Sequence, residues 1–319
     1  MLAGLDMLSG NDEFRSDYNQ TVARYYDGAY ATLASLGPDV DFYAGLAVES
    51  GGPVLELGCG TGRVLLEVAR RGVACTGLDS SEAMLNVLRE KPGAEKLELH
   101  RTAMQNFDFG ARRFALVFSA FRAFQHLYGV DEQLACLERV RRHLAPGGRF
   151  AFDVFCPRLD RTAREREPET EDLRFEDGAD TIVRSVTVER DVAGQMMRLD
   201  MRFERHRNGN VVSGESERIN LRWFYRYELE HLMFRAGFSR VEIHGDFDGS
   251  GFHDFDDIPG FVAILSGNAP IGGDLQVTPE PSSIVLALIG GVAFLAGRRR
   301  KLPGRFVFGL RGQTGHQSH

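Results

Sequence analysis

The stretch VLELGCGTGRVLLEVARRGVACTGLD, residues 54–79, decides the fold of the chain. An apolar run at 53–57 is typical of a buried strand, and it leads through a glycine-rich turn into helical spacing at 62–71. A second apolar run, 73–78, ends at Asp79. Two buried strands joined by a short helix predict a βαβ unit, in which the strands are parallel.

The alternation of strands and helices continues beyond this unit. Ser80 or Ser81 is placed to cap a second helix, because a serine hydroxyl accepts a hydrogen bond from a free backbone N–H. Further strands are expected at 97–101, 114–119, 149–155, 240–244 and 261–265, and further helices at 131–144 and in a segment ending at Gly237. The sequence predicts an α/β domain over residues 51–266, with a Rossmann-like, mostly parallel sheet and helices on both faces.

The sequence changes character between residues 157 and 222. The charge-dense stretch 158–180 is expected to be a solvated loop. Three segments with alternating apolar and polar residues follow at 181–190, 196–207 and 215–224. They predict an inserted antiparallel β meander, which covers the pocket or forms the contact of a homodimer, because an exposed meander needs a face to bury.

The glycine loop, Glu56 to Gly62, is the first candidate site. Glycine has no Cβ, so Gly58 and Gly60 permit a tight turn and let a ligand approach the backbone. The spacing is GxGxG, whereas dinucleotide-binding loops have GxGxxG. Asp79, at the end of the next strand, is placed to accept hydrogen bonds from two ribose hydroxyls. The loop and the acid together favour a nucleoside-containing ligand over an ordinary strand-to-helix turn.

Three stretches of the chain resemble class I S-adenosylmethionine-dependent methyltransferases. They are residues 54–85, FALVFSAFRAFQHL at 114–127 and LAPGGRFAFDVF at 144–155. The resemblance covers roughly residues 18–266. It implies S-adenosylmethionine as the cofactor and methyl transfer to an unidentified small molecule as the activity, with a nitrogen or oxygen atom as the acceptor.

The resemblance and the position of the strand ends indicate which residues bind the cofactor. Glu56 would fix the loop and help to hold the cofactor's amino group, and the glycines would pass beneath its methionine part. Many relatives place an acidic residue after the third strand to bind adenine, whereas this chain has Met104 and Gln105 there. The expected cofactor-binding residues are Glu56, Gly58, Cys59, Gly60, Gly62, Asp79, Met104, Ser119 and Ala120.

His126 is the candidate catalytic residue, because it is able to take a proton from a hydroxyl or ammonium acceptor. A packed or surface histidine is the alternative. Its surroundings resemble a stretch of glycine and sarcosine N-methyltransferases, which leaves the role open. Tyr25 and Tyr26 lie on an N-terminal helix, within residues 1–50, that is expected to lid the cofactor; core packing is their alternative. Arg63 is expected either to contact the cofactor's carboxylate or to be solvated.

The composition narrows the classes of partner and site. A net charge of −7 gives no general attraction to phosphate backbones, so a nucleic-acid partner is not expected. The four cysteines are far apart and form no CxxC pair, so neither a metal site nor a disulfide scaffold is expected. The first twenty residues have no basic region followed by a long apolar stretch, so the catalytic domain is expected to be cytoplasmic.

The C-terminal part resembles a PEP-CTERM sorting signal. A glycine-containing linker at 267–278 precedes Pro-Glu-Pro, an apolar segment and Arg-Arg-Arg-Lys, at 279–301. The apolar segment, 282–297, predicts a hydrophobic helix of about 24 Å, shorter than the roughly 30 Å of a membrane's hydrocarbon core. Two interpretations of residues 279–301 are open: the segment attaches the protein to a membrane, or it is an inert relic. Residues 302–319 are expected to be a disordered tail. A sorted envelope protein with a vestigial, non-catalytic nucleotide fold is the rival to the enzyme.

Overall fold

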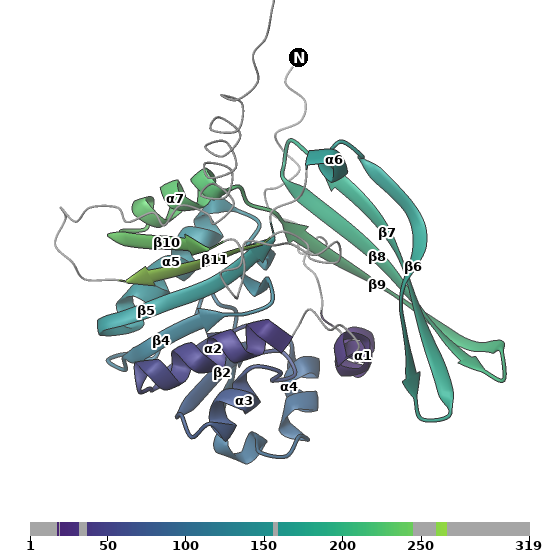
Figure 1. Ribbon diagram of the computed structural model, residues 1–319, viewed down its shortest axis with the longest axis horizontal. Coiled ribbons are helices and arrows are strands. Elements are labelled where there is room, and N and C mark those ends of the chain that lie inside the picture. Colours follow the sequence, from purple (N-terminus) through teal and green to yellow (C-terminus); the bar gives the residue numbers. More distant parts are fainter. Residues whose placement is uncertain (1–17, 19, 32–36, 156–158, 245–259, 267–319) are drawn as a thin grey trace, which may run out of the picture.

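The central element of the computed structural model is a seven-stranded sheet in the order β10-β11-β5-β4-β1-β2-β3 (Figure 1). The structure describes residues 18, 20–31, 37–155, 159–244 and 260–266. Strands β1 to β5 pair in parallel, and β11 runs antiparallel to both β5 and β10. The strands are β1 (Val54–Leu57), β2 (Cys75–Asp79), β3 (Glu98–Arg101), β4 (Phe114–Ser119), β5 (Leu144–Phe155), β10 (Arg240–His244) and β11 (Gly260–Ser266). The predicted Rossmann-like sheet is confirmed.

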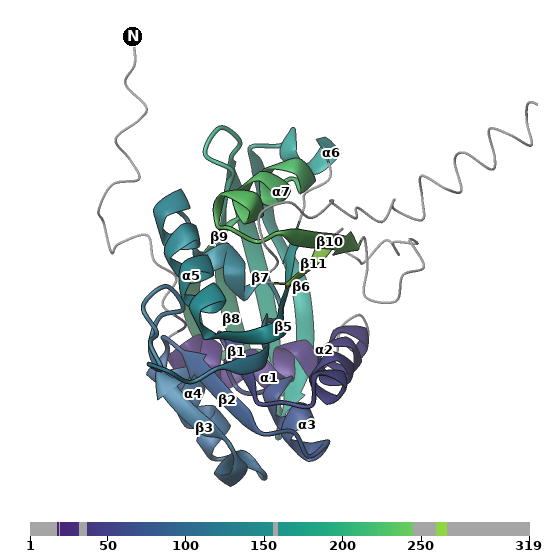
Figure 2. The same cartoon turned by 90° about the vertical axis from the view of Figure 1, so that its left-hand side faces the viewer.

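Helices cover both faces of this sheet (Figure 2). Successive strand residues point to opposite faces. Leu55 and Leu57 pack in one core cluster with α5 and α7, whereas Val54 packs in another with α2, α3 and α4. Burial on both faces explains why these strands read as continuous apolar runs. The helices are α2 (Gly37–Ser50), α3 (Leu65–Arg70), α4 (Glu82–Arg89), α5 (Val130–His143) and α7 (Arg226–Arg235), with short 3₁₀ turns η3 (Ala94–Lys96) and η4 (Ala123–His126).

The inserted meander forms a second, antiparallel sheet in the order β6-β7-β8-β9. Helix α1 (Gln20–Ala31) lies between the two sheets (Figure 1). It is fastened to the meander by Glu215, whose carboxylate accepts hydrogen bonds from Thr21 Oγ1 at 2.8 Å and from Arg24 Nη1 at 2.9 Å. The insertion contains α6 (Leu159–Thr162), β6 (Arg166–Asp177), β7 (Asp180–Asp191), β8 (Met196–Arg207) and β9 (Asn210–Arg222).

The expectation of a solvated loop at 158–180 is wrong, because this stretch holds α6 and the whole of β6. Leu173 and Phe175 supply the buried face of β6 and pack in the cluster that includes α1. The charges are accommodated in pairs, such as Arg190 Nη2 with Glu167 Oε1 at 2.8 Å. Two bulges interrupt the register with β7, so the alternation that marks a strand is lost in the sequence.

Some predictions fall on parts of the chain that the structure leaves undescribed. The hydrophobic C-terminal helix at 279–301, the linker 267–278 and the tail 302–319 lie outside the described residues. Within the described ranges, no helix is both long and apolar enough to cross a membrane. Of the expected N-terminal lid, α1 lies over the site, whereas α2 packs against β4 and α3 as part of the sheet's cover.

Candidate active site

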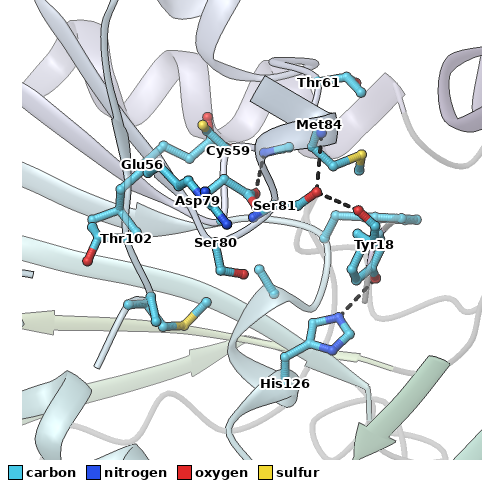
Figure 3. A pocket seen from close by; sticks show the side chains of 18 of the residues that line it. Tyr18, Glu56, Cys59, Thr61, Asp79, Ser80, Ser81, Met84, Thr102 and His126 are labelled. Atoms are coloured by element: carbon cyan, nitrogen blue, oxygen red, sulfur yellow. Dashed lines mark hydrogen bonds between the residues drawn. The ribbon is translucent and has the colours of Figure 1, made fainter. Parts of the chain in front are cut away.

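A pocket of about 480 Å³ opens at the carboxyl ends of β1, β2 and β4. The strand order of the sheet reverses between β1 and β4, which is where ligands bind in open α/β sheets. Figure 3 shows Glu56, Cys59 and Asp79 at one end of this pocket, and Tyr18 with His126 at the other.

The glycine loop forms the floor of the first end. The backbone N–H groups of Gly58 and Cys59 donate to the carbonyl of Leu78, at 2.8 and 2.9 Å, so the loop is fastened to β2. Gly58 and Gly60 have φ of +73° and +52°, a region that side chains disfavour. Both line the pocket, as does Cys59; Gly62, at φ +82°, is outside its lining and approaches Leu88 of α4.

Asp79 connects this loop to the start of α4. Its Oδ2 accepts the N–H of Gly60 and its Oδ1 the N–H of Ser81, both at 2.8 Å. Burial raises the pKa of Asp79, and these backbone donors oppose that rise. A carboxylate has about four acceptor positions, so Asp79 keeps capacity for a ligand's hydroxyls. The predicted helix cap is confirmed at Ser81, whose Oγ accepts the N–H of Met84 at 3.2 Å.

Glu56 places a buried carboxylate beside the loop. The residue is 3% exposed, and burial raises its pKa well above the usual range, while the charge of Arg63 opposes the rise. Among the described residues, its Oε2 has no hydrogen-bond partner. Because a buried oxygen without a partner is costly, this atom fits the amino group of the S-adenosylmethionine expected from the sequence.

Arg63 is held by an ion pair, and its side chain is 21% exposed. Its guanidinium donates to both oxygens of Asp39, at 2.7 and 2.5 Å, and lies 5.1 Å from the ring centre of Phe121. It still lines the pocket. The segment after β3 does so as well: Met104 and Gln105 are part of the lining, in line with the expected position for adenine.

Of the two residues expected at the end of β4, only Ala120 lines the pocket. Ser119 is fully buried, and its hydroxyl donates to the carbonyl of Leu57 at 3.2 Å. It therefore joins β4 to β1. Successive residues of a strand point to opposite faces, so Ser119 and Ala120 point to different sides.

His126 lies at the second end of the pocket. Its Nε2 is 2.9 Å from the hydroxyl of Tyr18, and the two rings meet edge to face (Figure 3). Burial lowers the pKa of His126 to about 4, although the backbone of Asn220 opposes this shift. The imidazole is therefore neutral at pH 7. It is neither a surface histidine nor one packed away from the site.

The two tyrosines of α1 have different surroundings. Tyr26 lines the pocket, whereas Tyr25 stacks on Phe203 of the meander at 5.1 Å between ring centres. Adjacent residues of a helix point about 100° apart, so one faces the pocket and the other the core. Tyr25 therefore packs in the core, whereas the lid role of Tyr26 stays a prediction.

Two residues at this end carry no motif and were missed. Tyr18 precedes the first helix, and its carbonyl accepts a hydrogen bond from Ser81 Oγ. Asp153 lies near the carboxyl end of β5 and is 7% exposed. An acid inside an apolar strand, as in FDVF, was the available signal for Asp153; Tyr18 had none. No cluster of three acidic, histidine or cysteine side chains suited to a metal lies within the described residues.

Comparisons with known families give two matches. The model described as a methyltransferase domain matches residues 54–148, which contain the glycine loop, Asp79 and His126. A model of the PEP-CTERM protein-sorting motif matches residues 277–301. The two matches do not overlap, as expected for a catalytic domain followed by a separate C-terminal motif.

Individual relatives cover most of the chain. A dTDP-3-amino-3,6-dideoxy-alpha-D-glucopyranose N,N-dimethyltransferase from Streptomyces fradiae is 29% identical, covering 77% of this chain and 94% of the relative. The CcbJ methyltransferase structure from Streptomyces caelestis is 29% identical with a TM-score of 0.64, covering 80% and 99%. Streptomyces venezuelae DesVI is 25% identical with a TM-score of 0.61, covering 76% and 97%. The chain is an S-adenosylmethionine-dependent methyltransferase, with a methyltransferase domain that matches at 54–148 and a PEP-CTERM motif at 277–301.

Proposed function

We propose that this enzyme methylates a nitrogen atom of a small molecule in the pocket between the glycine loop and His126. The observation that carries the proposal is a single cavity with the cofactor's expected residues at one end and a neutral His126, bonded to Tyr18, at the other. The name of the Streptomyces fradiae relative, an amino-sugar N,N-dimethyltransferase, supports nitrogen.

Each cofactor-side residue receives a role in this proposal. Asp79 binds the ribose hydroxyls, Glu56 holds the amino group, and the loop from Gly58 through Cys59 to Gly60 supports the methionine part. Met104 packs against adenine, and Ala120 lies beside the point of transfer. Bound S-adenosylmethionine supplies a methyl group on a sulfonium, which is a good leaving group, so orientation and exclusion of water provide much of the rate.

His126 favours nitrogen over oxygen as the acceptor atom. A pKa of about 4 makes the imidazole a weak base at neutral pH, far from the match that ionising a hydroxyl requires. A neutral amine attacks without prior ionisation: its lone pair forms the new N–CH₃ bond as the S–CH₃ bond breaks, with that pair left on sulfur. The extra proton on nitrogen then leaves to His126 or to water. His126 and Tyr18 thus orient the amine, and an oxygen acceptor is the second candidate.

Product identification tests the proposal directly. The full chain is incubated with methyl-labelled S-adenosylmethionine and a metabolite extract, and in parallel with matched panels of small amines and alcohols. A labelled amine is the expected product. A labelled ether or ester contradicts the nitrogen assignment. Cofactor binding without any labelled product points to a regulator that binds but does not transfer.

We further propose that the catalytic domain, 51–266, works at the cytoplasmic side of a membrane to which residues 279–301 attach it. The match to a sorting motif and the basic cluster at 298–301 support attachment, since each basic residue near an anionic surface contributes about 1 kcal/mol. Fractionation of cells expressing the full chain or a version ending at residue 270 tests this. Both versions in the supernatant, with equal activity, would mark the segment as inert.

We propose two roles for the meander: it covers the acceptor side of the pocket, and it forms the contact surface of a homodimer. Tyr128, which lines the pocket, donates its hydroxyl to the carbonyl of Asn220 on β9 at 3.1 Å. Arg222 Nη1 in turn donates to the carbonyl of Tyr128 at 2.8 Å. Light scattering on the purified chain measures the oligomeric state, and a monomer at micromolar concentration contradicts the dimer.

A further inference from the structure

The turn between β4 and η4 has an unusual backbone. Phe121 and Arg122 have φ of +52° and +65°, and neither is glycine. L-residues other than glycine, asparagine and aspartate seldom adopt this region, and two in succession persist only where neighbouring groups fix them. The turn matters for the site because Phe121, Ala123 and His126 all line the pocket.

Asp153 of β5 is the group that fixes this turn. Its Oδ1 accepts the N–H of Phe121 at 2.8 Å, and its Oδ2 accepts the N–H of Arg122 at 2.9 Å. The hydroxyl of Tyr43, from α2, donates to the same Oδ1 at 2.7 Å. Hydrogen bonds to an ionised acceptor are about twice as strong as neutral ones, so the carboxylate form holds the turn best.

The surroundings of Asp153 disfavour its charge. Burial raises the pKa of Asp153 to about 6. The Tyr43 hydroxyl and the charge of Arg122 oppose this rise, whereas the charge of Asp39 adds to it. A neutral side chain of similar size would escape this penalty. The location of an acid in an otherwise apolar strand is therefore poorly explained by stability alone.

We propose that Asp153 is a positioning residue, which in its ionised form orients Phe121 and His126 at the acceptor end and releases the turn when protonated. The proposal rests on the proposed function only for the identity of that end. Protonation removes the negative charge and turns one lone pair into an O–H, so the hydrogen bonds from the three donors weaken. As the pH falls through about 6, the turn should therefore open locally while the sheet remains folded.

Amide hydrogen exchange on the full chain tests the proposal without an acceptor. In Asp153→Asn, the side-chain NH₂ faces a donor, so at least one bond is lost. One bond to a charged acceptor corresponds to about tenfold to a hundredfold in an equilibrium, and exchange at Phe121 and Arg122 should rise by that factor. Asp108→Asn is the matched control, because exposed Asp108 also accepts a backbone N–H, from Gly110 at 2.8 Å. It should leave exchange in the turn unchanged.

The pH profile separates positioning from a merely structural role. After correction for intrinsic exchange, the wild-type turn should lose protection below pH 6, and Asp153→Asn should be flat. Tyr43→Phe removes a bond that lowers the pKa of Asp153, so the midpoint should move to higher pH. A wild-type turn with no such transition, or equal protection in folded Asp153→Asn, overturns the proposal.

Calorimetry with S-adenosylmethionine is run on the same samples. A wild-type chain that does not bind the cofactor contradicts the proposed function and leaves the exchange result standing. Cofactor binding with an unresponsive turn contradicts only the role of Asp153.

Discussion

The two ends of the pocket are built in different ways. Most of the cofactor end is made by one continuous stretch, 54–79, whose backbone N–H groups bond to Leu78 and to Asp79. The acceptor end brings Tyr18 to His126 across 108 residues of sequence. One end is thus a local structure set by strand and turn geometry, and the other is a product of tertiary packing. We expect substitutions at the cofactor end to affect binding, and those at the acceptor end to affect turnover.

The largest effect is expected for Gly60→Val at the cofactor end. A β-branched side chain at φ +52° is strained, and Gly60 lines the pocket where the cofactor is proposed to pass. Cofactor affinity should fall more than about a thousandfold, or 4 kcal/mol. Gly72→Val is the matched control, with φ +84° and open space around its Cβ, and it should keep the affinity. Calorimetry that finds equal affinities in both variants would show the loop to be misplaced.

His126→Ala tests the acceptor end. His126 is proposed to orient the amine and is only a weak base, so the expected loss lies at the lower limit for a general base, about 100-fold in kcat. Cofactor affinity should hardly change. Exposed His231, on α7, provides the control substitution to alanine. Equal kcat for the His126 variant and the control would return His126 to a packing role.

The lowered pKa of His126 also predicts that the free energy of unfolding depends on pH. Its pKa is about 4 in the folded chain and about 6.5 when unfolded, so its contribution is present above pH 6.5 and lost as the pH falls through 4. The loss should amount to about 3 kcal/mol. Subtracting the unfolding free energies of His126→Asn from those of the wild type isolates this term, because other buried acids are common to both. A pH-independent difference contradicts burial of a neutral imidazole.

Asp79→Ala should have an intermediate effect on binding. It removes a charged acceptor from the proposed ribose site and also frees the N–H groups of Gly60 and Ser81. Affinity for S-adenosylmethionine should fall about tenfold to a hundredfold by calorimetry. Asp79→Asn keeps one oxygen acceptor, so its affinity for the cofactor should lie between that of the wild type and that of Asp79→Ala. Unchanged affinity in a folded alanine variant removes Asp79 from the site.

The smallest effect is expected where α1 meets the meander. Glu215→Gln weakens the contacts to Thr21 and Arg24 and so loosens the helix that carries Tyr26. Such partly exposed pairs are worth little, so KM for the acceptor should rise about twofold to fivefold, with cofactor affinity unchanged. If cofactor affinity falls as much as acceptor affinity, the two ends are less separate than proposed.

The glycine loop and Asp79 were placed beside one pocket from the sequence because their signals are local. The strand, the glycine turn and the Ser81 cap each depend on neighbours a few residues away. The acceptor end depends on contacts between distant segments, so Tyr18 and Asp153 were missed. Of the expected cofactor-binding residues, Gly62 and Ser119 do not line the pocket. Strand β6 was missed for another reason: its charges are satisfied by cross-strand partners, which composition cannot reveal.

The attachment of α1 to β9 has a consequence for synthesis. Thr21 leaves the ribosome 194 residues before Glu215, the residue that holds it. Strands β1 to β5 are complete by residue 155, so the glycine loop and Asp79 can assemble while α1 still lacks its partner. Nascent chains stopped between these points would carry the glycine loop and Asp79 in place, while α1 would dock over the pocket only after β9 has been synthesised.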